Sequence, residues 1–474
     1  MDDKSLWGTE TAKAVENFPI SGEPIPASVV HWLGRLKSAA AAVNADLGLL
    51  DVDMAALIGR AADEVAAGSH DDQFPVDVFQ TGSGTSSNMN ANEVISALTD
   101  GAAHPNDHVN LGQSSNDVFP SAVQLALLDA CASGVIPALA GLVSALDERA
   151  EAFADVVKSG RTHLMDAVPI TLGQEFAGYA AQVRAAAAGI AATMPALGAI
   201  PLGGTAVGSG LNTHSEFAER VVARLRSIGV GGEQISIPQD RFAAQAARDP
   251  IVATSGAMKV LAVALTKICN DLRWMSSGPR AGLGEIRLPE LQKGSSIMPG
   301  KVNPVIPEAV LQVCAQVIGN DTTITVAGMQ GNFELNVMIP VMARNALQSA
   351  DLLTSSTRVL ADRCVSGIEA DEERCLHLAE LTLATATALN PVIGYDEATT
   401  IVKEAASSGR TLRDVAREHG VADEILDAAL DLRQIAAGNR AAPPDHPPSR
   451  LRRDSAGPSR PNSDTSAGSG TEAP

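Results

Sequence analysis

Apolar residues recur every three or four positions along much of the chain between residues 118 and 364. This spacing puts apolar side chains on one face of an α-helix, so the region is predicted to form several helices of about 20 residues or more. Alanine and glycine are frequent beside these stripes, which favours close packing of the helices in a long bundle. Such stripes are more often protein core than cofactor sites. Clear examples are Val135, Leu139, Leu142 and Leu146; Phe176, Ala180, Val183, Ala187, Ile190 and Met194; and Leu261, Leu265, Ile268, Leu272 and Met275.

The hydrophobic pattern changes on both sides of this region, which predicts a mainly α protein with three domains and a tail. Residues 1–113 are expected to form a mixed N-terminal domain with a helix from about residue 26 to residue 47. Residues 114–370 are expected to form the central bundle, and residues 371–438 a small helical C-terminal domain. Residues 439–474 are rich in Pro, Ser, Gly and Arg, so this tail is expected to be disordered.

Composition mainly excludes classes of partner. The chain has 474 residues, of which 45% are hydrophobic, and a formal net charge of −20. An acidic chain without a basic patch argues against nucleic acid or an anionic membrane as partner, although a locally basic pocket can still hold an anion. No uninterrupted apolar run is long enough to span a bilayer and no signal segment is recognised, which predicts a cytoplasmic protein. The five cysteines are scattered, so neither a disulfide framework nor a metal site is expected.

One stretch, Gly294–Pro304, concentrates polar chemistry in a loop between two predicted helices. It carries two serines, a lysine and an asparagine, together with apolar residues that a solvated linker does not need. Glycine and proline are common in any loop, so composition alone leaves an ordinary exposed loop open. The concentration of reactive groups favours a loop that closes over a site.

Three further polar segments precede or open predicted helices: residues 80–90, 113–117 and 159–169. Free N–H groups at a helix N-terminus suit a carboxylate, but a capped helix with a polar loop explains residues 80–90 as well and is favoured for that segment alone. The third segment contains His163, and a lone histidine is more often structural than catalytic. Glu308 lies in the first turn of a predicted helix, where an acidic residue is expected as a capping charge.

The stretch Gly294–Pro304 resembles the signature of the fumarase/aspartase superfamily, Gly-Ser-Ser-x-Met-Pro-x-Lys-x-Asn-Pro. Gly300 and Val302 at its variable positions are similar to the fumarase and aspartase branch. The other polar segments also match family segments in order and spacing, which reverses the interpretation of residues 80–90 as a simple cap. The resemblance implies a fumarase/aspartase-like fold, mainly α, whose long central bundle assembles into a homotetramer. It also implies active sites shared between three subunits, and a small dicarboxylate substrate.

As to function, the resemblance implies reversible hydration of fumarate to L-malate by proton abstraction and general acid–base catalysis. Ser295 would take the carbon-bound proton, and it would need help from loop amides because a serine hydroxyl is too weak an acid to ionise alone. His163 would act on the oxygen side, with Glu308 hydrogen-bonded to it. No metal ion or cofactor is implied. The residues that would bind substrate are Ser83, Gly84, Thr85, Ser114, Ser115, Asn116, Thr162, Ser296, Lys301, Val302 and Asn303.

A second dicarboxylate site is implied by His104, Pro105, Asn106 and Asp107, which resemble such a site in some fumarases. Some relatives carry an arginine three residues before the histidine, where this chain has Gly101, and this departure weakens the prediction. The family also usually carries further residues before the segment matched by Leu6-Trp7-Gly8. The first strand of the family is therefore expected to be missing here, or lost to a different start site.

Aspartate ammonia-lyase is the nearest alternative function. Thr162-His163 argues against it, because aspartases typically carry Thr-Gln at these positions. More distant members of the superfamily carry different residues around the lysine. A catalytically inactive structural homologue would lack Ser295, His163 or Lys301, and all three are present. The glycine-rich turn at residues 203–208 lacks the flanking elements and the lysine of a nucleotide-binding loop.

Overall fold

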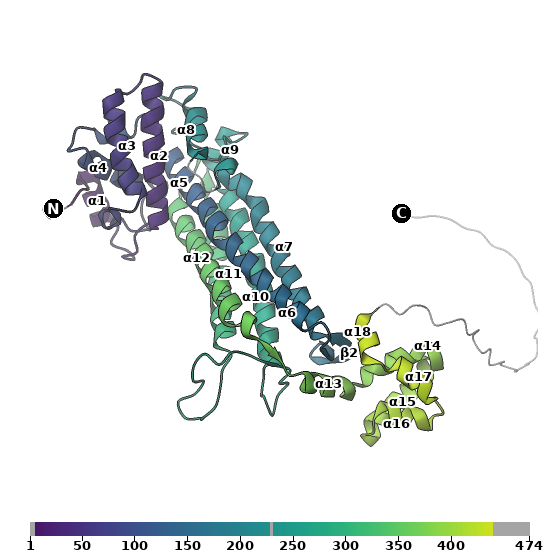
Figure 1. Cartoon of the computed structure of the whole chain (residues 1–474). Coiled ribbons are helices and arrows are strands. Elements are labelled where there is room, and N and C mark those ends of the chain that lie inside the picture. Colours follow the sequence, from purple (N-terminus) through teal and green to yellow (C-terminus); the bar gives the residue numbers. More distant parts are fainter. Residues whose placement is uncertain (1–4, 228–230, 439–474) are drawn as a thin grey trace, which may run out of the picture.

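The computed structural model describes residues 5–227 and 231–438, and most of these residues are helical. Long helices run side by side as a bundle that forms the middle of the molecule (Figure 1). The predicted mainly α fold with a long central bundle is confirmed. The bundle helices are α5 (Ser115–Asp129), continued through the π turn η3 (Ala130–Val135) into α6 (Ile136–Ala152), α7 (Leu172–Gly198), α10 (Asp249–Met275), α11 (Val305–Gly328) and α12 (Ile339–Arg363).

The apolar stripes of the sequence form the core of this bundle. Leu139, Phe176, Leu261 and Leu265 are each 0% exposed. Each helix therefore hides one face against its neighbours, and removal of apolar surface from water stabilises the packing by about 25 cal/mol per Å². The helices pack against one another because none could bury its apolar face alone.

Two helical stretches, Ser115–Ala152 and Asp249–Met275, reach the length and hydropathy of a membrane span. The prediction concerned uninterrupted apolar runs, and neither stretch is one, since charged residues such as Asp129 and Lys259 interrupt them. Both stretches belong to the bundle, where 44% of the most apolar window of each is buried. Packing between helices within the chain therefore accounts for part of their apolar character.

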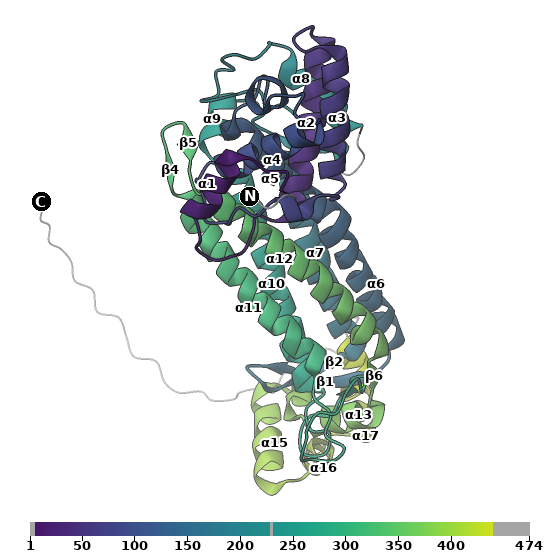
Figure 2. The same cartoon turned by 90° about the vertical axis from the view of Figure 1, so that its left-hand side faces the viewer.

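The N-terminal helices α1 to α4 lie at one end of the bundle (Figure 2). The predicted helix at residues 26–47 is confirmed as α2, and Gly34 lets it approach α3 closely, since a Cβ there would lie 2.6 Å from the Ala66 nitrogen. The expectation of mixed structure is wrong for described residues 5–113, where the extended segments form only an isolated bridge between Pro24 and Asp77. The elements at this end are α1 (Thr9–Asn17), α2 (Ala27–Asp46), α3 (Val52–Ala66), η1 (Asp71–Gln73), α4 (Thr85–Leu98), η2 (Pro105–Val109), α8 (Phe217–Arg226), η4 (Gly232–Gln234) and α9 (Arg241–Ala246), with the hairpin β4 (Gly331–Asn332) and β5 (Leu335–Asn336).

The opposite end carries a second hairpin and the C-terminal helices. The hairpin pairs β1 (Val157–Thr162) with β2 (Met165–Thr171), and a two-stranded sheet pairs β3 (Ile286–Arg287) with β6 (Glu369–Ala370). Apolar side chains of the last helices form a cluster of their own. The predicted disorder at residues 439–474 lies outside the described residues. The C-terminal elements are η5 (Val365–Gly367), α13 (Glu372–Leu381), η6 (Leu383–Leu389), α14 (Asn390–Ile393), α15 (Tyr395–Ser408), α16 (Leu412–Glu418), α17 (Asp423–Ala429) and α18 (Leu432–Ala437).

Candidate active site

The signature stretch forms a compact loop between β3 and the start of α11. The Gly294 N–H donates to the Lys301 carbonyl at 2.8 Å, and Asn303 Nδ2 donates to the Gly294 carbonyl at 2.7 Å. These two bonds close the loop at its base. Ile297 at its tip is 84% exposed, and Ser296, Lys301 and Val302 are also exposed. The loop therefore holds its own shape, with Ser296 and Lys301 exposed and Ser295 and Asn303 half-buried.

Ser295 lies in a small cradle of backbone amides within this loop. Its Oγ accepts hydrogen bonds from the Ile297 N–H at 3.2 Å and from the Met298 N–H at 3.0 Å. Two N–H dipoles aimed at one hydroxyl oxygen stabilise negative charge on that oxygen. The arrangement supplies the amide donors that a serine base requires. Lys301, predicted beside it, contributes its backbone carbonyl to the closure of the same loop.

His163 lies at the tip of the β1–β2 hairpin. Thr162 pairs with Met165, so His163 and Leu164 are the two residues of the turn, with φ of 57° and 60°. Positive φ at both positions is typical of a type I′ hairpin turn; histidine is among the residues enriched in this region, whereas leucine is rare there. Such strained turns persist only where the surroundings hold them, and they are frequent at functional sites. Thr162 and His163 are exposed at the tip.

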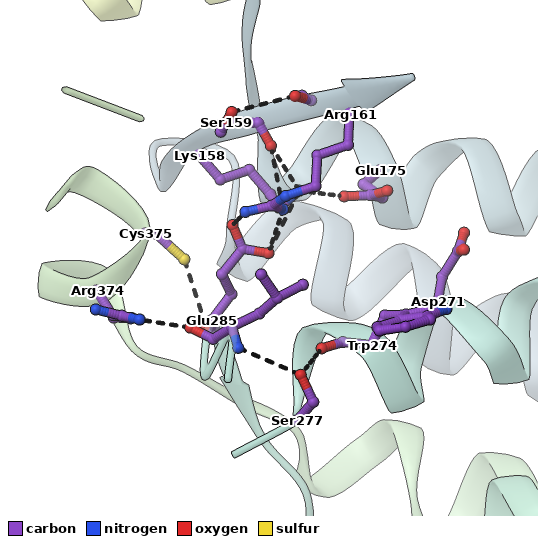
Figure 3. Close-up of polar contacts among 12 residues, drawn as sticks. Lys158, Ser159, Arg161, Glu175, Asp271, Trp274, Ser277, Glu285, Arg374 and Cys375 are labelled. Carbon is purple, nitrogen blue, oxygen red and sulfur yellow. Dashed lines mark hydrogen bonds and ion pairs between the residues drawn. The ribbon is translucent and has the colours of Figure 1, made fainter. Parts of the chain in front are cut away.

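The hairpin is held from below by a buried ionic network that the sequence analysis did not find (Figure 3). Glu285, 0% exposed, accepts two hydrogen bonds from Arg161, both at 2.9 Å. Lys158 Nζ lies 3.6 Å from the same carboxylate and 2.9 Å from Glu175. A register shift in β1 between Ser159 and Arg161 lets both cations reach Glu285, although residues three apart in a regular strand face opposite sides.

Glu285 also ties the loop after α10 to the C-terminal region. Its carbonyl accepts from the Asp371 N–H at 2.9 Å and from Cys375 Sγ at 3.4 Å. The hairpin that carries His163 and the segment that leads to Ser295 are therefore anchored on one residue. No hydrogen bond joins His163 to Glu308 within the described chain, so the predicted pairing is not formed inside one subunit.

The remaining predicted substrate residues gather at the N-termini of α4 and α5. The Ser83 and Thr85 hydroxyls lie 2.8 Å apart. Gly84, with φ of 75°, packs directly on Phe119 of α5, and a Cβ at residue 84 would lie 2.1 Å from that ring. This close approach brings the first cluster beside the Ser114–Asn116 cluster.

The start of α5 is organised by Asp117, which the sequence analysis did not single out as functional. Ser114 and Asp117 form a capping box, and the carboxylate also accepts from the Gly203 and Thr205 N–H groups, both at 2.9 Å. Burial raises the pKa of Asp117 to about 6, and its amide donors act in the opposite direction. Asn116 Nδ2 donates to the Ala206 carbonyl at 3.0 Å. The glycine-rich turn at residues 203–208 therefore packs directly against the Ser114–Asn116 cluster.

The implied second dicarboxylate site lies at the short π turn η2. His104 Nδ1 lies 3.1 Å from the Asp107 carboxylate and accepts from the Asp107 N–H at 3.1 Å. His104, Asn106 and Asp107 are exposed, and Pro105 is half-buried. The residues are thus close together, with the histidine capping its own turn. Their part in dicarboxylate binding stays a prediction.

The predicted site residues fall into two groups at opposite ends of the bundle (Figure 1). The clusters at Ser83–Thr85 and Ser114–Asn116 lie at the end capped by α1–α4. Thr162, His163, the signature loop and Glu308 lie at the end next to α13. Helix α10 has 27 residues, so it spans about 40 Å at about 1.5 Å per residue. A single chain cannot bring the two groups to one substrate.

Comparison with known proteins agrees with these features. Residues 2–319 match the family described as Lyase, and residues 386–437 match the family described as Fumarase C C-terminus. The chain is 51% identical to the class II fumarate hydratase of Corynebacterium glutamicum over 446 residues, covering 92% of this chain and 94% of that protein. It is 53% identical to the class II fumarate hydratase of Mycobacterium tuberculosis, covering 91% and 93%.

A solved structure extends the comparison to three dimensions. The class II fumarase from Schistosoma mansoni superposes with a TM-score of 0.90 at 38% identity, covering 93% of this chain and 97% of that one. Sequence and fold therefore agree over nearly the whole length of both chains. The chain belongs to the class II fumarases of the fumarase/aspartase superfamily.

Proposed function

We propose that this protein catalyses the reversible hydration of fumarate to L-malate. The observation that carries the proposal is the Ser295 hydroxyl in its cradle of two amide donors, within a loop that also bears Lys301 and Asn303. A weakly acidic proton beside a carboxylate calls for a base whose charged form is stabilised in place. The identity to fumarate hydratases supports this reaction over ammonia elimination.

In the direction from malate, Ser295 as alkoxide removes the proton from the carbon next to the carboxylate. The bond electrons pass into that carboxylate, which becomes a doubly charged enolate form. Lys301 stabilises this charge as a cation and Asn303 as an amide donor. The double bond then forms as the hydroxyl group leaves the neighbouring carbon, and protonated His163 gives that group a proton, so that water departs. None of these steps requires a metal ion.

The active enzyme is proposed to be a homotetramer with shared sites. The separation of the two residue groups by about 40 Å supports this, because copies that pack side by side in opposite directions bring the Ser114–Asn116 end of one to the Ser295 end of another. Glu308 and His163 lie at the same end of the bundle without a hydrogen bond between them in the described chain, so their pairing is proposed to need a third copy that meets the first at that end. The five cysteines are unpaired and buried, which supports a reducing, cytoplasmic compartment.

Ultraviolet absorbance of the purified protein with L-malate, and separately with L-aspartate, tests the reaction. Fumarate is expected to appear from malate alone. Fumarate from aspartate alone would make the protein an ammonia-lyase and refute the role of His163 as discriminator.

Subunit mixing tests the shared site. As pure tetramers, Ser295→Ala chains should be nearly inactive and Ser115→Ala chains should keep turnover with a strongly raised KM, so both are assayed at a malate concentration well below that KM. When the two are unfolded and refolded together, about one site in four should receive both intact residues, because each contributing chain is drawn at random. Recovery of activity supports the shared site, and no recovery in assembled tetramers would contradict it.

A further inference from the structure

Lys37 of α2 is a buried lysine without a role in the mechanism so far. It is 0% exposed, and in the described chain its Nζ makes one hydrogen bond, to Asn110 Oδ1 at 2.8 Å. A buried ammonium with so few partners is costly for folding. Hydrophobic packing would be served better by methionine or leucine, so the lysine calls for another explanation.

Asn110 and Asn88 connect Lys37 to Ser115. Asn110 Oδ1 accepts from both Lys37 Nζ and Asn88 Nδ2, the latter at 3.2 Å. Asn88 Nδ2 also donates to Ser115 Oγ at 3.2 Å. The four side chains form one continuous path from the interior of the N-terminal helices to the predicted substrate cluster.

Lys37 and the Gln113 carbonyl together set the direction of these hydrogen bonds, since Asn110 Nδ2 donates to that carbonyl at 3.2 Å. An ammonium group can only donate, so it requires the oxygen of the Asn110 amide to face it. That oxygen in turn requires the nitrogen of the Asn88 amide. Asn88 Oδ1 is buried without a hydrogen-bond partner in the described chain, so its own oxygen does not dictate this orientation.

The consequence appears at Ser115. Its Oγ already accepts from Asn88, so its own hydrogen is left to be donated elsewhere. A carboxylate ligand accepts hydrogen bonds, so it binds a hydroxyl that is already oriented as a donor. A hydroxyl with random orientation loses entropy when the ligand orders it, which weakens binding.

We propose that Lys37 is a positioning residue for dicarboxylate binding, which acts through Asn110 and Asn88 to hold Ser115 as a hydrogen-bond donor toward the substrate. This inference rests on the proposed function, since it takes Ser115 to contact a substrate carboxylate. Burial lowers the pKa of Lys37 to about 7, and the buried Asp117 carboxylate favours its charged form. The charged form can only donate, so it is the form that fixes the Asn110 amide, whereas the neutral amine can also accept.

The test is steady-state kinetics of Lys37→Met with L-malate, beside Lys13→Met as a matched control. Lys13 lies on α1 with a 60% exposed side chain paired to Glu10, away from this path. Lys37→Met is expected to raise KM about tenfold or more with a smaller change in kcat, since a hydrogen bond to a charged group is lost in binding. Lys13→Met should leave both constants unchanged.

A double variant separates positioning from a general structural defect. If Lys37 acts through Ser115, then Lys37→Met combined with Ser115→Ala should have the same KM as Ser115→Ala alone, within about twofold. Additive effects, or an unchanged KM in Lys37→Met, would overturn the proposal.

If Lys37→Met does not assemble, Asn88→Ala can replace it, because it interrupts the same path. Asn88→Ala should show the same rise in KM and the same non-additivity with Ser115→Ala. If either is missing, the proposal is wrong. Wild-type protein that cannot interconvert malate and fumarate would refute the proposed function and this role with it. Active wild type beside an unaffected Lys37→Met would refute the role of Lys37 alone.

Discussion

Replacement of Glu285 by glutamine tests how the catalytic hairpin is held. The side chain is 0% exposed and neutralises Arg161 and Lys158 at the base of the β1–β2 hairpin. Glutamine has nearly the same shape, so the change removes the charge and leaves little cavity. Arg161 then loses the carboxylate it pairs with, Lys158 keeps Glu175 at 2.9 Å, and one amide oxygen replaces two carboxylate oxygens as acceptors.

The expected cost is large because the charges are out of water. Removal of one partner from a buried ion pair costs about 3–5 kcal/mol, whereas an exposed pair contributes about 1 kcal/mol or less. A matched control is Asp147→Asn, which breaks the exposed pair of Asp147 with Arg184, whose side chains are 50% and 57% exposed. The control should lower the free energy of unfolding by less than about 1 kcal/mol.

Urea titration at one protein concentration, followed by circular dichroism, measures the stability of both variants against wild type. The kcat for L-malate reports whether the hairpin still holds His163 in place, because His163 lies two residues beyond Arg161. We expect kcat to fall about tenfold to a hundredfold in Glu285→Gln, as a small displacement of a catalytic group has effects of this size. If Glu285→Gln were no less stable than Asp147→Asn, the argument that this buried network holds the hairpin would be refuted.

Three further predictions concern single side chains. Ser295→Ala should lower kcat by orders of magnitude with an unchanged circular dichroism spectrum, and near-normal turnover would exclude it as the base. His163→Asn should lower kcat while size-exclusion chromatography shows the same assembly, and unchanged kinetics would remove it from the mechanism. His419 bridges Glu404 and Glu397, and these hydrogen bonds raise its pKa above the ordinary value of 6.5. A raised pKa in the folded state stabilises the protein below pH 6.5, and this contribution disappears as the pH rises through the folded pKa. Thermal unfolding of His419→Gln should therefore differ from wild type at low pH and converge with it at high pH, and a pH-independent difference would contradict this.

The helices and their caps could be read from local sequence. Apolar spacing of three and four residues predicts the buried faces of α6, α7 and α10, since that spacing maps directly onto one side of a helix. The Ser114–Asp117 capping box is likewise a pattern within one turn. The prediction of mixed helix and strand structure for residues 1–113 was wrong for a related reason. Short extended segments gain strand structure only from a partner, and the chain supplies them with a single bridge.

Sequence motifs identified the residues with candidate chemistry, but they did not predict how these residues are arranged in space. The signature loop, His163 and the polar helix starts are short patterns, so the sequence by itself determined which residue types are available. Only the tertiary structure decided that Glu285 meets Arg161, 124 residues away in the chain, and that Lys37 lies behind Asn110, 73 residues away. It also decided that the two groups of site residues lie at opposite ends of the bundle. The physical reason is that helical periodicity records only which face of a segment is buried, whereas the partners of a buried charge follow from the packing of whole helices.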